Sequence, residues 1–332
     1  MREKAYVSGV LLGAGLLLYL GRDLLTRSAL LTWGLSFAGT TAVGILAMAL
    51  YRVLAELRAS QHELARKGAE LNFAFEVQQA LFPRQFPSKG GLEFAAVCQP
   101  ARGISGDYYD VLPLSDGRVA FALADISGKG ISAAILMSNL HAVLRTLART
   151  IRMPGQLCSE LNRHLYEITQ PAAKFATLFY GEWNGADRQL SYVNAGHPLP
   201  ILLGSGRGRR LDRGGPPLGL FLDSEYEVGN VPLQPGDTIV LYSDGVTDAE
   251  TPEGQPFGEA RLETLVAAHC EKPLSEIRRV VLVAARDWSG PEILDDMTLL
   301  LARVTGPAKE VQLRWAVWDC GIRFAFSSPC SP

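Results

Sequence analysis

Residues 29–51 carry no charged side chain and are long enough, as a helix, to cross the apolar core of a lipid bilayer. A shorter charge-free stretch, residues 5–20, comes before them, and residues 21–28 form a tight link between the two. This pair of apolar segments predicts a transmembrane helical hairpin over residues 1–51, with both ends on one side of the membrane. The alternatives are a hairpin buried in a protein core and a cleaved signal peptide, although no small-residue cleavage pattern follows the first stretch.

Basic residues indicate which side of the membrane holds the rest of the chain. Arg2 and Lys4 precede the first apolar stretch, and further basic residues follow the second, beginning with Arg52. An excess of Lys and Arg beside membrane helices marks the cytoplasmic side. Arg22 and Arg27 in the link weaken this assignment. We expect an inner or plasma membrane protein whose remaining domain is cytoplasmic.

A polar helix is predicted over residues 52–83, ending at Pro83, which cannot continue a helix. Residues at alternating steps of three and four form a heptad seam: Leu54, Leu57, Gln61, Leu64, Gly68, Leu71, Phe75, Gln78 and Phe82. One interpretation is a single amphipathic helix packed against the following domain. The other is a parallel coiled coil that makes the chain a homodimer through residues 52–82. The seam is weak at its Gln and Gly positions, and both interpretations stay open.

Residues 84–305 have the pattern of one globular domain. Eight β-like runs are bounded by Gly, Pro or Asp: residues 92–101, 118–126, 175–183, 190–194, 199–203, 226–233, 238–243 and 297–304. Four helices are expected, at residues 131–150, 154–169, 259–270 and 274–288. Strands come in consecutive groups with helices in pairs between them, which predicts an α+β fold of antiparallel sheets flanked by helices. Residues 306–332 continue no pattern and are a tail of unknown structure.

Composition excludes several classes of function. The formal net charge is -2, so the chain lacks the basic footprint of a nucleic-acid-binding protein. Its five cysteines are scattered and contain no C-x-x-C pair, which argues against both a disulfide framework and a zinc site. The five histidines are equally dispersed. Any metal site in this chain is therefore expected to use oxygen ligands.

Carboxylates stand at the ends of several predicted strands. Asp107, Asp125 and Asp244 each adjoin an apolar run, and Asp295 and Asp296 directly precede the last strand. A carboxylate at the end of a buried strand is costly unless a cation meets it, and hard ions such as Mg²⁺ or Mn²⁺ prefer oxygen ligands. Asp-Gly pairs are also common turn residues, and that explanation suffices for Asp116 and Gly117, which join two predicted strands. It does not suffice for Asp125 or Asp244, because no second strand follows either directly.

These motifs, in this order, resemble a known family. They are residues 102–110 (RGISGDYYD), 124–130 (ADISGKG), 194–198 (NAGHP), 215–219 (GPPLG), 242–248 (YSDGVTD) and 295–299 (DDMTL). Together they resemble the PPM-type, or type-2C, protein phosphatases of the bacterial SpoIIE/RsbU branch, over roughly residues 78–304. Residues 77–83 (VQQALFP) also resemble the lead-in helix of that branch. The resemblance implies a β-sandwich flanked by helices.

The resemblance also implies a centre of two Mn²⁺ or Mg²⁺ ions. Asp125 matches the bridging aspartate, and Ile126 matches the residue that supplies a backbone carbonyl. The other acidic positions match Asp107, Asp244 and Asp295, whereas Asp296 falls where relatives often have Asn. Asp125, Asp107 and Asp244 are thus the expected catalytic residues. Phosphate monoesters would be hydrolysed by metal-activated water, without a phosphoenzyme.

Three further positions are less certain. Arg102 has the spacing of the family's phosphate-binding arginine, and a solvated loop arginine is an equal alternative. Ser127 stands where many type-2C enzymes carry a histidine as candidate general acid. His197, between two predicted strands, is better explained as part of a turn than as a replacement acid.

The expected function is therefore that of a membrane-anchored serine/threonine phosphatase acting on a phosphorylated regulatory protein. In the branch it resembles, the substrate is often an antagonist of an anti-sigma factor. A two-metal nuclease or phosphodiesterase would use a similar acidic set, but the charge balance argues against nucleic acid. A non-catalytic signalling module with a decayed phosphatase fold is the third possibility, although all four acidic positions are still present.

Overall fold

The computed structural model describes residues 12–19, 21–22, 29–87, 90–101, 103–170, 173–204, 208–290 and 295–306. The chain divides into two compact units, one up to Leu71 and the other from Asn72 onward. Much of the predicted link, residues 21–28, and the tail from residue 307 to 332 lie outside the described residues. Residues 12–19, within the first predicted apolar helix, are helical.

The long helix α3 runs without a break from Ala29 to Gln79. At 1.5 Å per residue it is about 75 Å long, so the apolar stretch and the polar linker form one helix. The hydroxyls of Thr40 and Thr41 bond back to the carbonyls of Ser36 and Phe37, which satisfies these polar groups within an apolar segment. The helix ends four residues before Pro83, earlier than predicted, because the next amides turn back onto carbonyls of its last turn.

The heptad seam of α3 divides between two environments. Leu54, Leu57 and Leu64 are exposed, whereas Gln78 and Phe82 are buried. The lower end of the seam thus packs onto its own domain, as the amphipathic-helix interpretation predicted. The leucines earlier in the seam are exposed, and the coiled coil stays a prediction.

The described helices include two that are long and apolar enough to cross a membrane by length and composition. One lies within α3, where the apolar side chains are exposed. The other is α4, residues Ile131–Thr150. It packs on the sheet of the second unit through Met137, Leu140 and Leu144, so its apolar character is that of a core helix.

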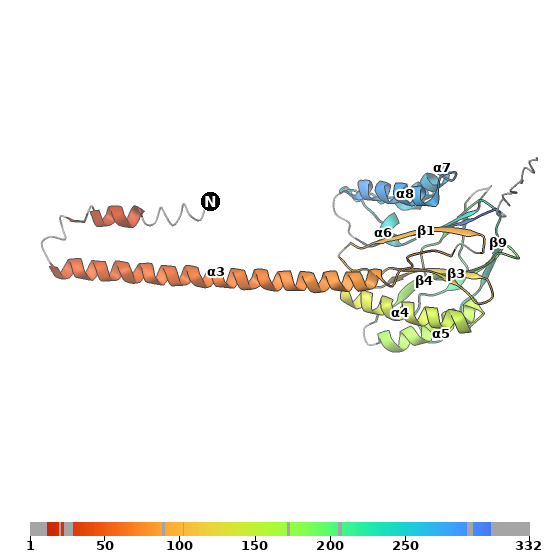
Figure 1. The fold of residues 1–332 in the computed structure, drawn as a ribbon, viewed down its shortest axis with the longest axis horizontal. Helices are drawn as coiled ribbons and strands as arrows, with labels where there is room; N and C mark the ends of the chain where they lie inside the picture. Colours follow the sequence, from red (N-terminus) through yellow and green to blue (C-terminus); the bar gives the residue numbers. More distant parts are fainter. Residues whose placement is uncertain are drawn as a thin grey trace, which may run out of the picture. The chain divides into compact units, whose positions relative to one another are not determined.

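The second unit is a sandwich of two sheets (Figure 1). One sheet has the order β1-β11-β10-β6-β7, formed by Leu92–Gln99, Met297–Val304, Thr238–Tyr242, Ile201–Leu203 and Arg209–Arg210. The other has the order β2-β3-β4-β5-β8, formed by Tyr108–Pro113, Val119–Ile126, Ala176–Asn184, Gln189–Ala195 and Gly214–Gly215, with β9 (Gly229–Pro232) also paired to β5. Every ladder is antiparallel except the short pairing of β5 with β8. The predicted α+β sandwich is confirmed.

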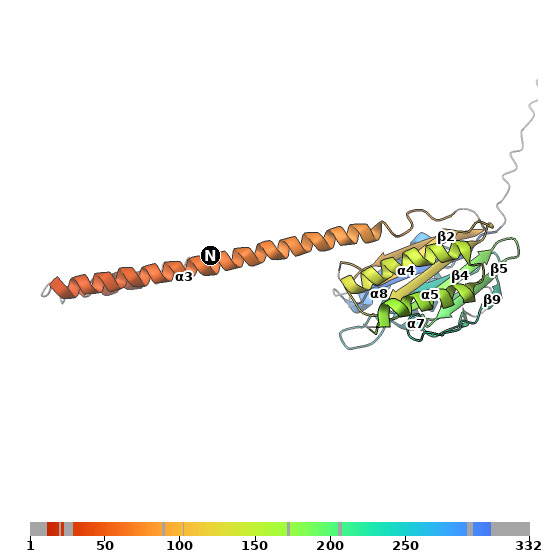
Figure 2. The ribbon, with the colours of Figure 1, turned by 90° about the horizontal axis from the view of Figure 1, so that it is seen from below.

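Helices cover both outer faces of the sandwich (Figures 1 and 2). The helix α4 and its neighbour α5 (Pro154–Thr169) pack on the sheet that contains β3, β4 and β5. On the other face, α7 (Gly258–Ala268) and α8 (Leu274–Ser289) cover the sheet that contains β1 and β11. The bounds of α4 and α5 agree with those predicted, because buried residues recur at helical spacing along each.

Aromatic side chains fill the space between the sheets. Phe94 of β1 meets Phe121 of β3 edge to face, with ring centroids 5.8 Å apart. Phe121 contacts Phe179 of β4, whose ring stacks on Tyr192 of β5 at 5.6 Å. These contacts cross from one sheet to the other and then along the second, so they fix the two sheets against each other.

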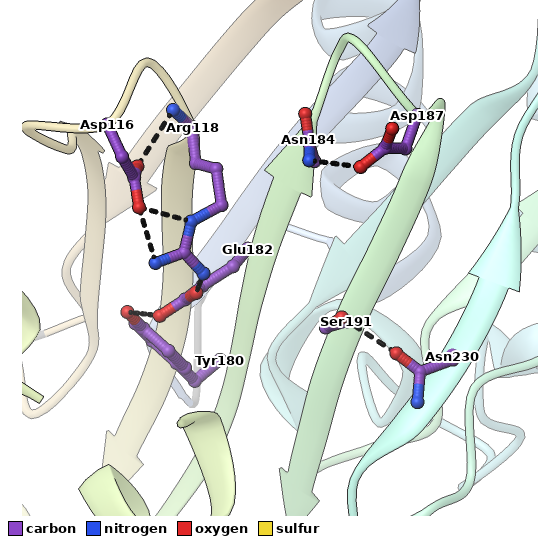
Figure 3. A network of polar contacts seen from close by, with 8 residues as sticks. All are labelled: Asp116, Arg118, Tyr180, Glu182, Asn184, Asp187, Ser191 and Asn230. Carbon is purple, nitrogen blue, oxygen red and sulfur yellow. Dashed lines mark hydrogen bonds and ion pairs between the residues drawn. The ribbon is translucent and has the colours of Figure 1, made fainter. Parts of the chain in front are cut away.

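A buried polar network lies at the start of β3 (Figure 3). Arg118 forms ion pairs with Asp116 and with Glu182, and the hydroxyl of Tyr180 donates to Glu182 at 2.7 Å. The Glu182 side chain is fully buried. Asp116 and Gly117 form the predicted turn between β2 and β3.

Candidate metal centre

Register brings Asp107 and Asp125 together. Tyr108, the first residue of β2, pairs with Ala124 of β3. Asp107 therefore lies directly across from Asp125, at the end of β3 opposite Arg118. Over seven residues at 3.3 Å each, this end is about 23 Å from the polar network.

The other sheet, which contains β10 and β11, contributes Asp244, Asp295 and Asp296. The amide of Ser243 donates to the Thr298 carbonyl at 2.9 Å, which extends the pairing of β10 with β11 toward these acids. Asp244 was predicted to end a strand. Instead it begins the short helix α6 (Asp244–Thr247), which Ser243 precedes.

Gly245 allows the two acidic segments of this sheet to touch. A Cβ atom at this position would collide with the Asp296 carbonyl oxygen. The backbone that follows Asp244 thus lies directly on the Asp295–Asp296 backbone. Only glycine permits this approach, which explains the Asp-Gly pair without a hairpin turn.

Asp296 joins the two sheets at this edge. Its carboxylate accepts hydrogen bonds from the amides of Ala101 and Gly106, at 2.7 and 2.9 Å, and from the Ser105 hydroxyl at 2.7 Å. With three donors already on its oxygens, Asp296 serves to hold the loop before β2. The half-exposed Asp295 is left as the better candidate ligand, in agreement with the sequence expectation.

The carboxylates at this edge perturb one another. Burial and the charges of Asp244 and Asp295 raise the pKa of Asp125 to about 7. Burial and the charge of Asp125 raise the pKa of Asp107, and burial with the charge of Asp295 raises that of Asp244. Without a cation, the cluster disfavours its own ionised form.

The cluster suits hard cations in its chemistry. Asp107 is 2% exposed, and its Oδ2 atom has no hydrogen-bond partner among the described residues. A buried carboxylate oxygen without a partner is costly unless a cation meets it. Within the described ranges, no group of three or more Asp, Glu, His or Cys side chains is placed closely enough to hold a metal ion. The arrangement is an acidic cluster with oxygen donors, which fits Mg²⁺ or Mn²⁺ better than a softer metal.

Ile126, the last residue of β3, lies against the loop that holds Asp107. A Cβ atom on Gly106 would be 3.1 Å from the Ile126 carbonyl oxygen and 3.3 Å from Ala133 Cβ. The carbonyl therefore faces the Gly106 backbone, next to Asp107. Its position is compatible with the ligand role that the resemblance implies, which stays a prediction.

Lys129 contacts the cluster, and sequence reasoning gave it no role. Its Nζ atom is 2.9 Å from Asp295 Oδ2, and its charge lowers the pKa of Asp244. The signal was a lysine between two glycines, directly after Asp125 and Ser127. Such a cation can neutralise part of the cluster when no metal does so.

The other singled-out residues have structural contacts or lie outside the described chain. The Ser127 hydroxyl accepts a hydrogen bond from the Phe175 amide at 2.9 Å. His197 is buried, which lowers its pKa to about 3, and its Nδ1 lies 2.9 Å from the Thr177 hydroxyl. A neutral, buried histidine supports the turn role expected for it. Arg102 lies outside the described residues.

Comparison with known families identifies a match over most of the second unit. The family described as Stage II sporulation protein E (SpoIIE) matches residues 115–305. Phosphoserine phosphatase RsbU of Bacillus subtilis is 32% identical over 250 residues, covering 74% of this chain and 72% of RsbU. Protein IcfG of Synechocystis is 31% identical over 261 residues, covering 70% of this chain. The chain spans only 41% of the length of IcfG.

Solved structures show the same fold. The SiaA-PP2C domain of Pseudomonas aeruginosa superposes with a TM-score of 0.66 at 22% identity, covering 72% of this chain and 98% of that domain. The RsbU and RsbW domains of Rv1364c from Mycobacterium tuberculosis give a TM-score of 0.59 at 27% identity, covering 67% and 63% of the two chains. Both support the sandwich described above.

Proposed function

Because the chain belongs to the SpoIIE family of PP2C-type serine phosphatases, we propose that it hydrolyses phosphoserine or phosphothreonine on a regulatory protein with the help of two divalent ions. The ions would be held by Asp107, Asp125, Asp244, Asp295 and the Ile126 carbonyl. The observation that carries this proposal is the acidic cluster itself, in which carboxylates from both sheets raise one another's pKa.

The chain's own residues would hold and orient the ions and the substrate, rather than form a covalent bond to the phosphoryl group. When bound, the ions would lower the pKa of a water molecule and neutralise charge on the phosphoryl oxygens. Asp296 keeps the loop before β2 in place, so that Asp107 stays opposite Asp125. Ser127 occupies the position of the family's candidate acid, where its hydroxyl accepts a hydrogen bond from the Phe175 amide. An aliphatic hydroxyl is a much weaker acid than an imidazolium, so Ser127 is a poor proton donor to the leaving oxygen.

A phosphoprotein is the best-supported substrate class. RsbU, which covers most of this chain, is named a phosphoserine phosphatase. The net charge of -2 gives no support to a nuclease, and all four acidic positions speak against a non-catalytic module. By the resemblance, the partner would be a phosphorylated antagonist of an anti-sigma factor.

Chelation is expected to lower phosphatase activity at least about 100-fold, since water activation and charge neutralisation would both be lost. The measurement is phosphate release from a phosphoserine protein by the purified chain, before and after EDTA. Adding Mn²⁺ or Mg²⁺ in excess should restore it, whereas Ca²⁺ serves as a control for ionic charge alone. Full activity in excess chelator would overturn the two-ion proposal.

We also propose that α3 anchors the chain in the inner or plasma membrane, with the phosphatase domain in the cytoplasm. The exposed apolar side chains of its first half support this. The full chain should sediment with membranes and need detergent for release, while a fragment that begins at Glu70 should stay in the supernatant. Recovery of the full chain in the soluble fraction without detergent would contradict the anchor. The homodimer through residues 52–82 stays a prediction.

A further inference from the structure

The last turn of α3 reaches the loop that carries the acidic cluster. Gln78 is only 4% exposed, although its side chain is a polar amide. Its Nε2 donates to the Ser105 carbonyl at 2.7 Å, and its Oε1 accepts from the Ser105 amide at 2.9 Å. One side chain therefore satisfies both backbone groups of a buried residue, much as a neighbouring strand would.

Ser105 in turn forms hydrogen bonds with two acidic residues. Its side chain is fully buried. The hydroxyl donates to Asp296 Oδ2 at 2.7 Å and accepts from the Asp107 amide at 2.9 Å. The Ser105 hydroxyl thus links Asp296, next to β11 of one sheet, to Asp107, next to β2 of the other.

A second contact fixes the segment just after α3 to the strand β2. The ring of Phe82 stacks on Tyr109 of β2, with centroids 4.7 Å apart. Phe82 is itself buried. Ser105, two residues before Asp107, is therefore held by Gln78 of α3. Tyr109, two residues after Asp107, is held by Phe82 just beyond the helix. Any shift of the helix end would move Ser105 relative to Asp296.

We propose that Gln78 is a positioning residue of the metal centre, which acts through Ser105 to set the separation of Asp107 and Asp296 and hence the affinity of the cluster for divalent ions. The proposal rests on the proposed function for the identity of the ions. It gives a role to a position that interrupts the heptad seam. Gln78 touches no substrate, so its effect is on ion binding rather than on the chemical step.

The decisive measurement is Mn²⁺ binding to the full chain in detergent, followed by the EPR signal of free Mn²⁺. Gln78→Met keeps the size of the side chain but removes both hydrogen bonds to Ser105. We expect about tenfold weaker Mn²⁺ binding, the scale of one buried hydrogen-bonded contact. Phosphate release at saturating Mn²⁺ should stay within about twofold of the unmodified protein.

Gln79→Met is the matched control. Gln79 is the adjacent residue of the same helix and is partly buried, and it takes no part in the two hydrogen bonds that Gln78 forms with Ser105. The same chemical change there should leave Mn²⁺ affinity unaltered. Ser105→Ala should weaken Mn²⁺ binding as Gln78→Met does, and the double variant should be no weaker than the worse single one, because both interrupt one route.

Thermal unfolding in EDTA identifies variants that fail to fold. If Gln78→Met is folded and binds Mn²⁺ as tightly as the unmodified protein, the proposal is wrong. If Gln78→Met does not fold, unchanged Mn²⁺ affinity in Ser105→Ala overturns it. Should the unmodified chain bind Mn²⁺ but release no phosphate from phosphoserine proteins, the proposed function fails while the positioning role is still decided by the binding data.

Discussion

Replacing Asp125 with Asn is expected to lower phosphate release by about three orders of magnitude or more while making the metal-free protein more stable. The loss of activity follows because, in the proposed two-ion centre, a neutral amide could not replace the carboxylate that both ions would share. The loss of one preorganised charge contact alone costs roughly 100- to 1,000-fold. The gain in stability follows because Asp125 is partly buried, and this burial together with the charges of Asp244 and Asp295 raises its pKa to about 7.

The pH dependence of this stability has a definite sign. The pKa of Asp125 is higher in the folded protein than its ordinary value of 3.8. Between those two values the folded state binds more protons than the unfolded state, so the free energy of unfolding falls as pH rises. The stabilisation by Asp125→Asn should therefore be absent near pH 4 and reach roughly 1–3 kcal/mol at pH 7.

Urea unfolding in EDTA between pH 4 and pH 8 measures this difference directly. Asp223→Asn provides the matched control, because Asp223 is exposed and the same substitution there should change neither activity nor stability by more than about 0.5 kcal/mol. If Asp125→Asn kept its phosphatase activity, Asp125 would not be a ligand in the metal centre. One that was destabilised at pH 7 would contradict the mutual repulsion of the cluster.

Much of the fold could be predicted because its signals are local. The bounds of α4 and α5 were readable from apolar residues at helical spacing, and β11 from a largely apolar run after Asp296. The end of α3 was placed too late, since Pro83 marks where a helix must end but not where it does end. Asp244 was assigned to a strand end because a four-residue helix has no periodicity to detect.

The candidate site was predictable only where residues formed recognisable motifs. Asp107 and Asp125 stood out as acids beside apolar runs, and the structure brings them together through strand register. Gln78 and Ser105 lie within the motif segments 77–83 and 102–110, but their role could not be predicted, because it depends on a contact between residues 27 positions apart. A local pattern can show that Gln78 interrupts a seam, but not which backbone groups its amide meets. The role of Lys129 likewise depends on its ion pair with Asp295, which is distant from it in the sequence.

The second large effect is expected at the opposite end of the sandwich, in the polar network of Figure 3. Arg118→Met should destabilise the fold by about 3–5 kcal/mol, because it leaves the carboxylate of Glu182 buried without its cation. Burial already raises the pKa of Glu182, while Tyr180 and Arg118 oppose that shift. Once the guanidinium is gone, the Tyr180 hydroxyl is the hydrogen-bond donor that this carboxylate keeps among the described residues.

A control variant and a rescue variant are both available in the sheet that contains β4 and β5. Ser191→Ala removes an exposed hydrogen bond to Asn230 and should change stability by no more than about 0.5 kcal/mol. Arg118→Met combined with Glu182→Gln should recover most of the loss, since a neutral amide needs no cation and its oxygen can still accept from the Tyr180 hydroxyl. A double variant as unstable as Arg118→Met alone would show that the loss comes from packing of the Arg118 stem.

Lowering the pH separates the charge from the shape of the Arg118 side chain. A proton on Glu182 can take the place of the missing guanidinium, so the destabilisation of Arg118→Met should shrink as the pH falls toward 5. Denaturant unfolding of the three variants at pH 5 and pH 7 measures this. Mn²⁺ affinity should be unaltered in each folded variant, because about 23 Å of β3 lies between Arg118 and Asp125. A change in Mn²⁺ binding would mean that the two ends of β3 are coupled and that this network belongs to the metal centre.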